Sequence, residues 1–89
     1  MNDIVPAFGV AVRQVRLSRG WSQEALSAQA ELNRSYVGEI ERGKVIASIV
    51  TVHKLARALE MPMSELLAKT DFIHRNLHAK AIQLAAIAC

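Results

Sequence analysis

The sequence is poor in cysteine, proline, glycine and aromatic residues, and each shortage excludes a class of protein. The single cysteine, Cys89, excludes an intramolecular disulfide and favours a reducing compartment. Two prolines, four glycines and 4% aromatic residues are too few for a sandwich of short strands, so helices are favoured. No apolar run approaches the roughly 18 residues of a membrane helix. A basic segment typical of a secretory signal is also lacking, so we expect a cytoplasmic protein with no membrane partner.

What the sequence does contain is enough for one small helical domain. Its 89 residues leave no room for a second domain, and a hydrophobic content of 52% excludes disorder along most of the chain. The formal net charge is +3. This mildly basic balance permits a polyanionic partner without requiring one.

Apolar residues recur at helical spacing in several segments, each bounded by capping residues. Ser22, Asn33 and Ser48 are favoured N-caps, and Gly20 and Gly43 are natural helix ends. The predicted helices cover Pro6–Arg19, Gln23–Gln29, Arg34–Arg42, a segment from Ile49 to Leu59, and Met63–Lys69. The residues predicted to face the core are Phe8, Ala11, Val12, Val15, Leu26, Ala30, Val37, Ile40, Ile49, Val52, Leu55, Ala56, Leu59, Leu66 and Leu67. The pattern predicts an all-α, compact five-helix domain over residues 1–70.

The remaining segment, residues 71–89, has a different composition, rich in alanine and other helix formers. Ile73, Leu77 and Leu84 fall on one predicted stripe, which is too apolar to lie loose in water. The segment therefore either folds back on the domain or meets another copy of itself. We take these three residues as predicted dimerisation residues. A helix lying on a membrane surface is a lower-ranked alternative, because the polar face is narrow.

Two short helices joined by a tight turn inside a bundle of small helices form the helix-turn-helix arrangement. Three spaced motifs carry a more specific likeness: Val15-Arg16-x-x-x-Gly20-Trp21-Ser22-Gln23-Glu24-x-Leu26, Ile40-Glu41-Arg42-Gly43 and Thr51-x-x-Lys54-Leu55-Ala56-x-Ala58-Leu59. Through them, residues 8–67 resemble the Cro and phage-repressor (XRE) type of DNA-binding protein. The resemblance implies a sequence-specific transcriptional regulator, a repressor or a restriction–modification controller, that binds double-stranded DNA as a homodimer. The run Asn33-Arg34-Ser35-Tyr36 is also similar to the start of this helix in restriction–modification controllers.

The resemblance implies that the third predicted helix reads bases in the major groove. The predicted base-reading residues are Asn33, Arg34, Ser35, Gly38 and Glu39. Arg34 is the best candidate because its guanidinium fork matches the O6 and N7 acceptors of guanine, and the alternative is a phosphate clamp. Glu39 is expected to accept a hydrogen bond from cytosine or to orient Arg34. Gly38, which costs about 1 kcal/mol in mid-helix, is expected to admit a thymine methyl or a neighbouring backbone.

A second group of residues is predicted to contact the DNA backbone. It consists of Arg13, Gln23, Tyr36, Arg42 and Lys44. Gln23 opens a helix whose unpaired N–H groups favour a phosphate oxygen, and a merely solvated glutamine is the alternative. Arg16 and Glu41 resemble the partly buried ion pair of the family. That likeness gives them the structural role of fixing the angle of the reading helix.

The chain departs from the family pattern in two turns. Glu31 stands where the turn before the reading helix usually has glycine. A non-glycine residue in the left-handed region costs roughly 1 kcal/mol, so the turn is expected to be either strained or differently shaped. Val45 and Ile46 bring apolar side chains into a loop after Gly43. They either pack against the C-terminal segment or form part of an interface.

Two other function classes have some support. A protein-interaction module, such as an antitoxin whose C-terminal segment holds a partner, would show no affinity for DNA at low salt. An enzyme would need a nucleophile with a base, paired carboxylates or a metal site. His74 and His78, four residues apart, offer such a site only together with Cys89. Two solvated histidines are the simpler interpretation, so we predict no catalytic residue, metal or cofactor.

Overall fold

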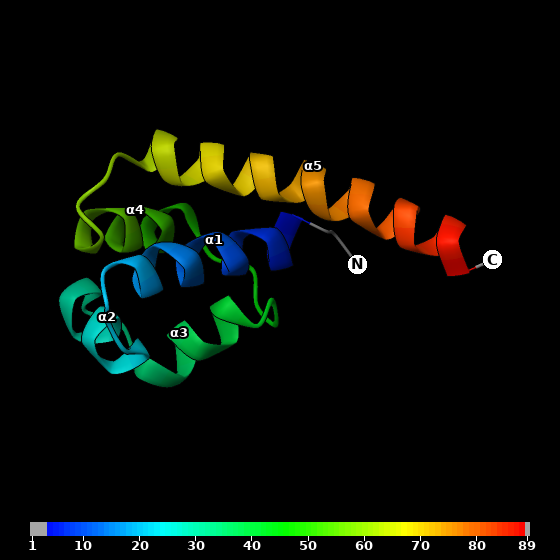
Figure 1. The fold of residues 1–89 in the computed structure, drawn as a ribbon. Helices are drawn as coiled ribbons and strands as arrows, with labels where there is room; N and C mark the ends of the chain where they lie inside the picture. The colour runs from blue at the N-terminus through cyan, green and yellow to red at the C-terminus, as the bar shows by residue number, and fades with distance from the viewer. Residues whose placement is uncertain (1–3, 89) are drawn as a thin grey trace.

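The computed structural model describes the backbone of residues 4–88 and the side chains of residues 4–76. Over residues 4–88 the chain forms five helices and no strand, which confirms the predicted all-α class (Figure 1). The helices are α1 (Ile4–Ser18), α2 (Gln23–Ala30), α3 (Arg34–Glu41), α4 (Ile49–Ala58) and α5 (Met63–Ala88). None of the helices, within the part of the chain that is described, is long and apolar enough to cross a membrane.

The core lies around α1, the central helix of the bundle. Figure 1 shows α1 between α5 on one side and the pair α2 and α3 on the other, and α1 packs against both α5 and α3. The buried apolar side chains are Ala7, Phe8, Ala11, Val12, Val15, Leu26, Ala30, Val37, Ile40, Val52, Leu55, Ala56, Leu59, Leu66 and Ile73. Most of the predicted core is therefore confirmed.

For three apolar residues the observed burial differs from the predicted burial. Ile49 is 65% exposed and Leu67 is 41% exposed, although both were expected to face the core. Ile49 is the first residue of α4, and Leu67 follows Leu66, which takes the inward position. Ile73, expected to face a second copy, is buried in the core of its own domain, so it is not an exposed dimerisation residue.

The long helix α5 corrects the prediction of a short helix followed by a separate segment. Its 26 residues run through position 70 without a break. Neither proline nor glycine occurs after Met63, and Thr70 is buried with its Oγ1 donating to the carbonyl oxygen of Leu66 at 2.9 Å. Since the C-terminal part of α5 projects beyond the bundle, it does not fold back on its own domain (Figure 1).

Several expectations concern parts of the chain whose side chains are not described. Leu77, Leu84 and His78 lie beyond the described side chains, and Cys89 lies outside the described residues altogether. The predicted contacts of the two leucines therefore stay a prediction, and so does the expectation that His74, His78 and Cys89 hold no metal. The division of function between residues 1–70 and 71–89 also stays a prediction.

The predicted capping residues begin their helices as expected. The Ser22 hydroxyl accepts a hydrogen bond from the backbone N–H of Ala25 at 3.0 Å, and the Ser48 hydroxyl accepts one from Thr51 at 3.1 Å. The first helix was predicted to begin too late in the chain, because α1 begins at Ile4, two residues before Pro6. A proline is tolerated there because N–H groups in the first turn have no partner within the helix.

The turn between α2 and α3 has a left-handed backbone at Glu31, which is the strained one of the two alternatives. Its φ and ψ are 56° and 45°. The backbone N–H of Glu31 donates to the carbonyl oxygen of Ala28, and that of Leu32 donates to Ser27. A second left-handed residue, Glu60 with φ of 58°, closes α4 and was not predicted from the sequence.

Replacing Glu31 with glycine is expected to raise the free energy of unfolding by about 1 kcal/mol. The left-handed conformation costs roughly 1–2 kcal/mol for a residue with a Cβ, and glycine loses part of this gain through its larger unfolded-state entropy. Thermal or urea unfolding of the purified variant measures the difference. The control is Glu65→Gly in the first turn of α5, which should lose stability because the backbone there is right-handed and helical. If both substitutions changed the free energy of unfolding equally, the backbone at Glu31 would not be strained.

Candidate nucleic-acid interface

Helix α3 lies at the surface of the bundle with one face in the core and the other in solvent. Val37 and Ile40 are 0% and 1% exposed, whereas Arg34, Ser35 and Arg42 are exposed. The inner face holds the helix in place, and the outer face carries cationic and hydrogen-bonding groups. Such a helix is suited to the major groove of duplex DNA, which admits an α-helix.

The first residues of α3 have defined partners. The Oδ1 atom of Asn33 accepts a hydrogen bond from the backbone N–H of Ser35 at 2.8 Å, so the side-chain NH₂ is the group of Asn33 left to donate to a base. Arg34 Nε lies 4.0 Å from Glu24 Oε1 on α2, with side chains 60% and 80% exposed. The structure thus supplies Glu24 as the neighbour of Arg34, where the sequence suggested Glu39. An exposed pair of this length contributes little, so Arg34 can leave it for DNA.

The structure contains the predicted ion pair between Arg16 and Glu41. Arg16 Nε donates to Glu41 Oε2 at 2.7 Å and Nη2 donates to Oε1 at 2.9 Å, while Nη1 donates to the backbone oxygen of Trp21 at 2.8 Å. Both charged residues are 8% exposed. The hydrogen bond to Glu41 raises the pKa of Arg16, against the lowering effect of burial, so the guanidinium stays charged. The pair joins the last turn of α1 to the end of α3.

Gln23 extends this network to the start of α2. Its Nε2 atom donates to Glu41 Oε1 at 3.1 Å, and the residue is half-buried. One amide hydrogen is used in this bond, and the second remains available to a phosphate oxygen. The predicted backbone contact of Gln23 therefore starts from a side chain that is already oriented by Glu41.

Gly38 lies under the end of the Arg42 side chain. A Cβ atom at Gly38 would lie 3.1 Å from Arg42 Nη1 and 3.4 Å from Gln23 Oε1. The space that was expected to admit a thymine methyl is therefore covered by an exposed and flexible guanidinium, and Gly38 itself is buried. Glu39, next along the helix, is half-buried.

Tyr36 braces α3 against α4. Its hydroxyl lies 3.4 Å from Thr51 Oγ1, which also accepts a hydrogen bond from Ser48 Oγ at 3.1 Å. The tyrosine is half-buried, so any contact of its hydroxyl with a phosphate would be made from the joint between the two helices.

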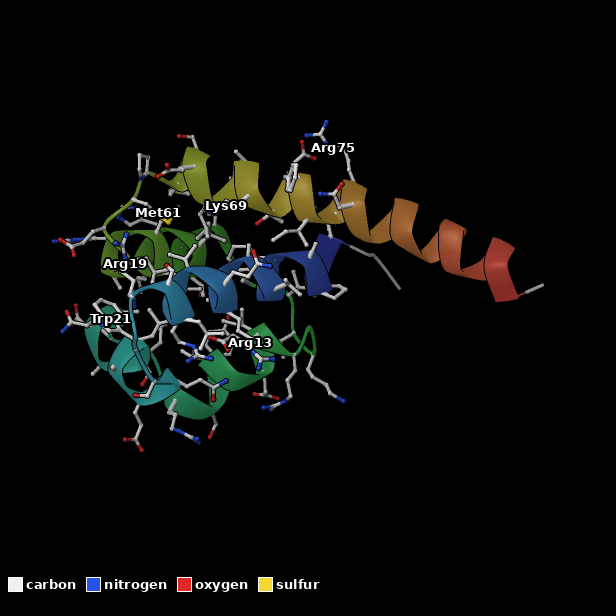
Figure 2. All side chains as sticks on the ribbon, viewed as in Figure 1. Arg13, Arg19, Trp21, Met61, Lys69 and Arg75 are labelled. Atoms are coloured by element: carbon white, nitrogen blue, oxygen red, sulfur yellow. The ribbon has the colours of Figure 1, made fainter. Side chains whose placement is uncertain are left out.

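Exposed cations surround the outer face of α3. Arg42 and Lys44 follow the last turn of α3, and Arg13, labelled in Figure 2, lies on α1, the helix that packs against α3. All three side chains are exposed. Cations at the rim of a reading helix attract phosphates of any sequence and add to the salt dependence of binding.

Two residues that shape this surface were missed by the sequence analysis. Gly9 lies where α1 meets the end of α3, and a Cβ there would collide with the backbone oxygen of Ile40 and lie 2.7 Å from that of Glu41. The available signal was a glycine in the middle of a helix, where it costs about 1 kcal/mol relative to alanine. For Glu24 no local signal existed, because its contact with Arg34 depends on how α2 and α3 pack.

Comparison with known proteins agrees with this geometry. A family model described as Helix-turn-helix matches residues 12–66. The control protein C.BamHI of Bacillus amyloliquefaciens is 40% identical over 67 residues, which cover 74% of this chain and 83% of that protein. The control protein C.MunI of a Mycoplasma species is 38% identical over 72 residues, which cover 80% and 97% of the two chains.

A solved structure extends the likeness to three dimensions. The restriction-modification controller protein C.AhdI from Aeromonas hydrophila superposes with a TM-score of 0.69 at 44% identity, covering 74% of this chain and 98% of that one. The chain therefore belongs to the helix-turn-helix family of DNA-binding transcriptional regulators, and its relatives within that family include restriction–modification control proteins.

Proposed function

We propose that two copies of this chain bind one operator, each placing α3 in a major groove. The observation that supports this most directly is that α3 has a fixed, buried inner face and an exposed arginine at its start. Val37 and Ile40 fix its inner face and Glu41 ties its end to α1, while Arg34 at its start stays exposed. Dimeric helix-turn-helix proteins place their reading helices about 34 Å apart, one turn of the duplex. The mechanism has no chemical step and needs no cofactor.

The proposed roles follow the positions of the side chains. Asn33, Arg34, Ser35 and Glu39 would meet base edges, with Arg34 on a guanine. Gly38 would do so only after the Arg42 guanidinium moves toward a phosphate. The phosphate contacts would come from Arg13, Gln23, Tyr36, Arg42 and Lys44.

The relatives suggest which genes such an operator controls. C.AhdI is named as a restriction–modification controller protein, and it is 44% identical to this chain. We place the operator of this protein upstream of restriction–modification genes, and the protein in the cytoplasm, where bacterial DNA lies.

Selection of bound sequences from a pool of random duplexes tests the proposal. The expected result is a symmetric sequence whose half-sites are about 10 base pairs apart, because a two-fold dimer reads the same sequence twice. A pool that shows no enrichment after several rounds would exclude sequence-specific binding. Enrichment of a single unpaired site would exclude the dimeric form.

Replacing Arg34 with alanine is expected to relax specificity at one base pair in each half-site. A bidentate arginine–guanine contact contributes about 1–3 kcal/mol of discrimination against other bases. Titrations of the selected operator and of its single-base variants measure this loss. The matched control is Arg42→Ala, which should weaken the operator and its variants alike and reduce the salt dependence of binding. If Arg34→Ala leaves the ranking of the variants unchanged, Arg34 is not the base reader.

A further inference from the structure

The side chain of Arg42, the residue that follows α3, folds back over this helix. A Cβ atom at Gly38, one turn earlier, would lie 3.1 Å from Arg42 Nη1 and 3.8 Å from Arg42 Cζ. The guanidinium therefore occupies the place that a side chain at position 38 would take. Gly38 is buried and Arg42 is exposed, so the glycine lies beneath a charged group that faces solvent.

Gln23 reaches the same point from the start of α2. Its Oε1 atom lies 3.4 Å from the position of the missing Cβ, and its Nε2 atom donates to Glu41 Oε1 at 3.1 Å. Because a carboxylate only accepts hydrogen bonds, the amide nitrogen of Gln23 must face Glu41. Glu41 is held in turn by two hydrogen bonds from Arg16. The buried ion pair thus orients the amide of Gln23 beside the Arg42 guanidinium.

No carboxylate neutralises the guanidinium at this point. None of the ion pairs among the described side chains, residues 4–76, includes Arg42, and the adjacent Glu41 is taken by Arg16. Gln23 also keeps a second amide hydrogen beyond the one given to Glu41. Two donors from different helices, one of them fully charged, suit a single anionic group, and a phosphate of the DNA backbone is such a group.

We propose that Gly38 is a positioning residue, whose missing side chain lets Arg42 lie beside Gln23 so that both bind the same DNA phosphate. The inference rests on the proposed function and assigns a mechanism to two of its phosphate contacts. In the complex the guanidinium keeps its place over Gly38, so Gly38 acts through Arg42 and touches no base. If the two side chains bound separate phosphates, position 38 would not need to be glycine.

A cycle of single and double substitutions, read out as affinity for the selected operator, tests the role of Gly38. Arg42→Ala should lower the slope of log affinity against log salt by about 0.9, the contribution of one phosphate contact. Gly38→Ala should weaken binding about threefold or more, but by less than the roughly twofold scatter of such cycles once Arg42 is alanine. A loss of equal size in both backgrounds would mean that the added methyl group meets DNA directly. That result, or unchanged binding by Gly38→Ala alone, would overturn the inference.

Lys44 supplies the matched control for this coupling. It is another exposed cation proposed to contact phosphate, and it is not among the nearest neighbours of the missing Cβ. The effects of Gly38→Ala and Lys44→Ala should therefore add. Coupling as strong as that with Arg42→Ala would show a general disturbance of α3 and would contradict a specific action through Arg42.

Methylphosphonates placed one at a time in the operator locate the phosphate, because each replaces a charged oxygen by a methyl group. At one position in each half-site, the replacement should weaken binding of the native chain and have no further effect on Arg42→Ala or Gln23→Ala. Different positions for the two variants would show separate phosphates, and the shared contact would be wrong.

The same measurements separate this inference from the proposed function. Phosphate contacts do not depend on base sequence, so the cycle can also be measured on duplexes of random sequence at low salt. A chain that shows the coupling between Gly38 and Arg42 but enriches no sequence would refute the proposed operator alone. A chain that enriches a symmetric operator without the coupling would refute the role of Gly38 alone.

Discussion

Replacing Glu41 with alanine is expected to destabilise the protein by about 3–5 kcal/mol. The substitution leaves Arg16, 8% exposed, without its bidentate partner, and breaking a buried pair by removing one member costs this much. The pKa of Arg16 is raised by the same carboxylate, so the arginine does not escape the cost by losing its proton. Against a typical domain stability of about 5–15 kcal/mol, the loss is large enough to be read directly from urea unfolding.

A matched control for Glu41→Ala is available on the surface of α5. Asp71 and Arg75 form a pair at 3.6 Å whose side chains are 65% and 71% exposed. Asp71→Ala should cost at most about 1 kcal/mol. The double replacement Arg16→Met with Glu41→Leu should be more stable than Glu41→Ala, because it leaves no buried charge. If Glu41→Ala and Asp71→Ala lowered the free energy of unfolding by similar small amounts, the buried pair would not contribute the proposed stability.

Gly9→Ala is expected to destabilise the protein by about 1–3 kcal/mol, although alanine is the better helix former. The added Cβ would collide with the backbone oxygen of Ile40 and lie 2.7 Å from that of Glu41, and backbone atoms at the end of α3 cannot rotate away. Overpacking of this kind forces the helices apart, at a cost larger than the gain of about 1 kcal/mol in helix propensity. Thermal unfolding measures the stability. A lower operator affinity at a temperature where the variant is folded would report the displaced α3.

Gly38→Ala makes the same chemical change at a site where the neighbours can move. Its Cβ would meet the end of the Arg42 side chain at 3.1 Å and Gln23 Oε1 at 3.4 Å. Both are ends of flexible side chains, so stability should be unchanged or rise by up to about 1 kcal/mol through helix propensity. If Gly9→Ala also proved neutral or stabilising, the close approach of α1 and α3 would not limit the residue at position 9.

Local rules were sufficient for the helix starts and for most inward faces. Ser22, Asn33 and Ser48 cap the helices they were expected to cap, because capping joins a side chain to a backbone group two or three residues away. The sequence left two forms of the turn at Glu31 open, strained or differently shaped, and the structure takes the left-handed, strained one. The start of α1 was less accurate, because a proline fits several positions of a first turn.

The functional surface was only partly predictable, since its residues come from separate helices. The exposure of Arg42 follows from the periodicity of α3, because Arg42 lies opposite Val37 and Ile40. Arg34 lies one turn before Val37 and is exposed because it is the first residue of the helix. The neighbour of Arg34 did not follow, because Glu24 reaches it from α2. The stripe assigned to dimerisation included Ile73, which the packing of α5 on α1 places in the core.

The sequence by itself determined where α2, α3, α4 and α5 start, which face of α1, α2 and α3 turns inward, and that α3 carries cationic side chains. These properties depend on contacts within a few residues, and helical periodicity encodes them directly. Only the tertiary structure decided that α1 must carry glycine where it meets α3, and that α5 continues past the bundle with Ile73 buried and Leu67 exposed. The physical reason is that close packing depends on distances between helices, which no local pattern of residues contains.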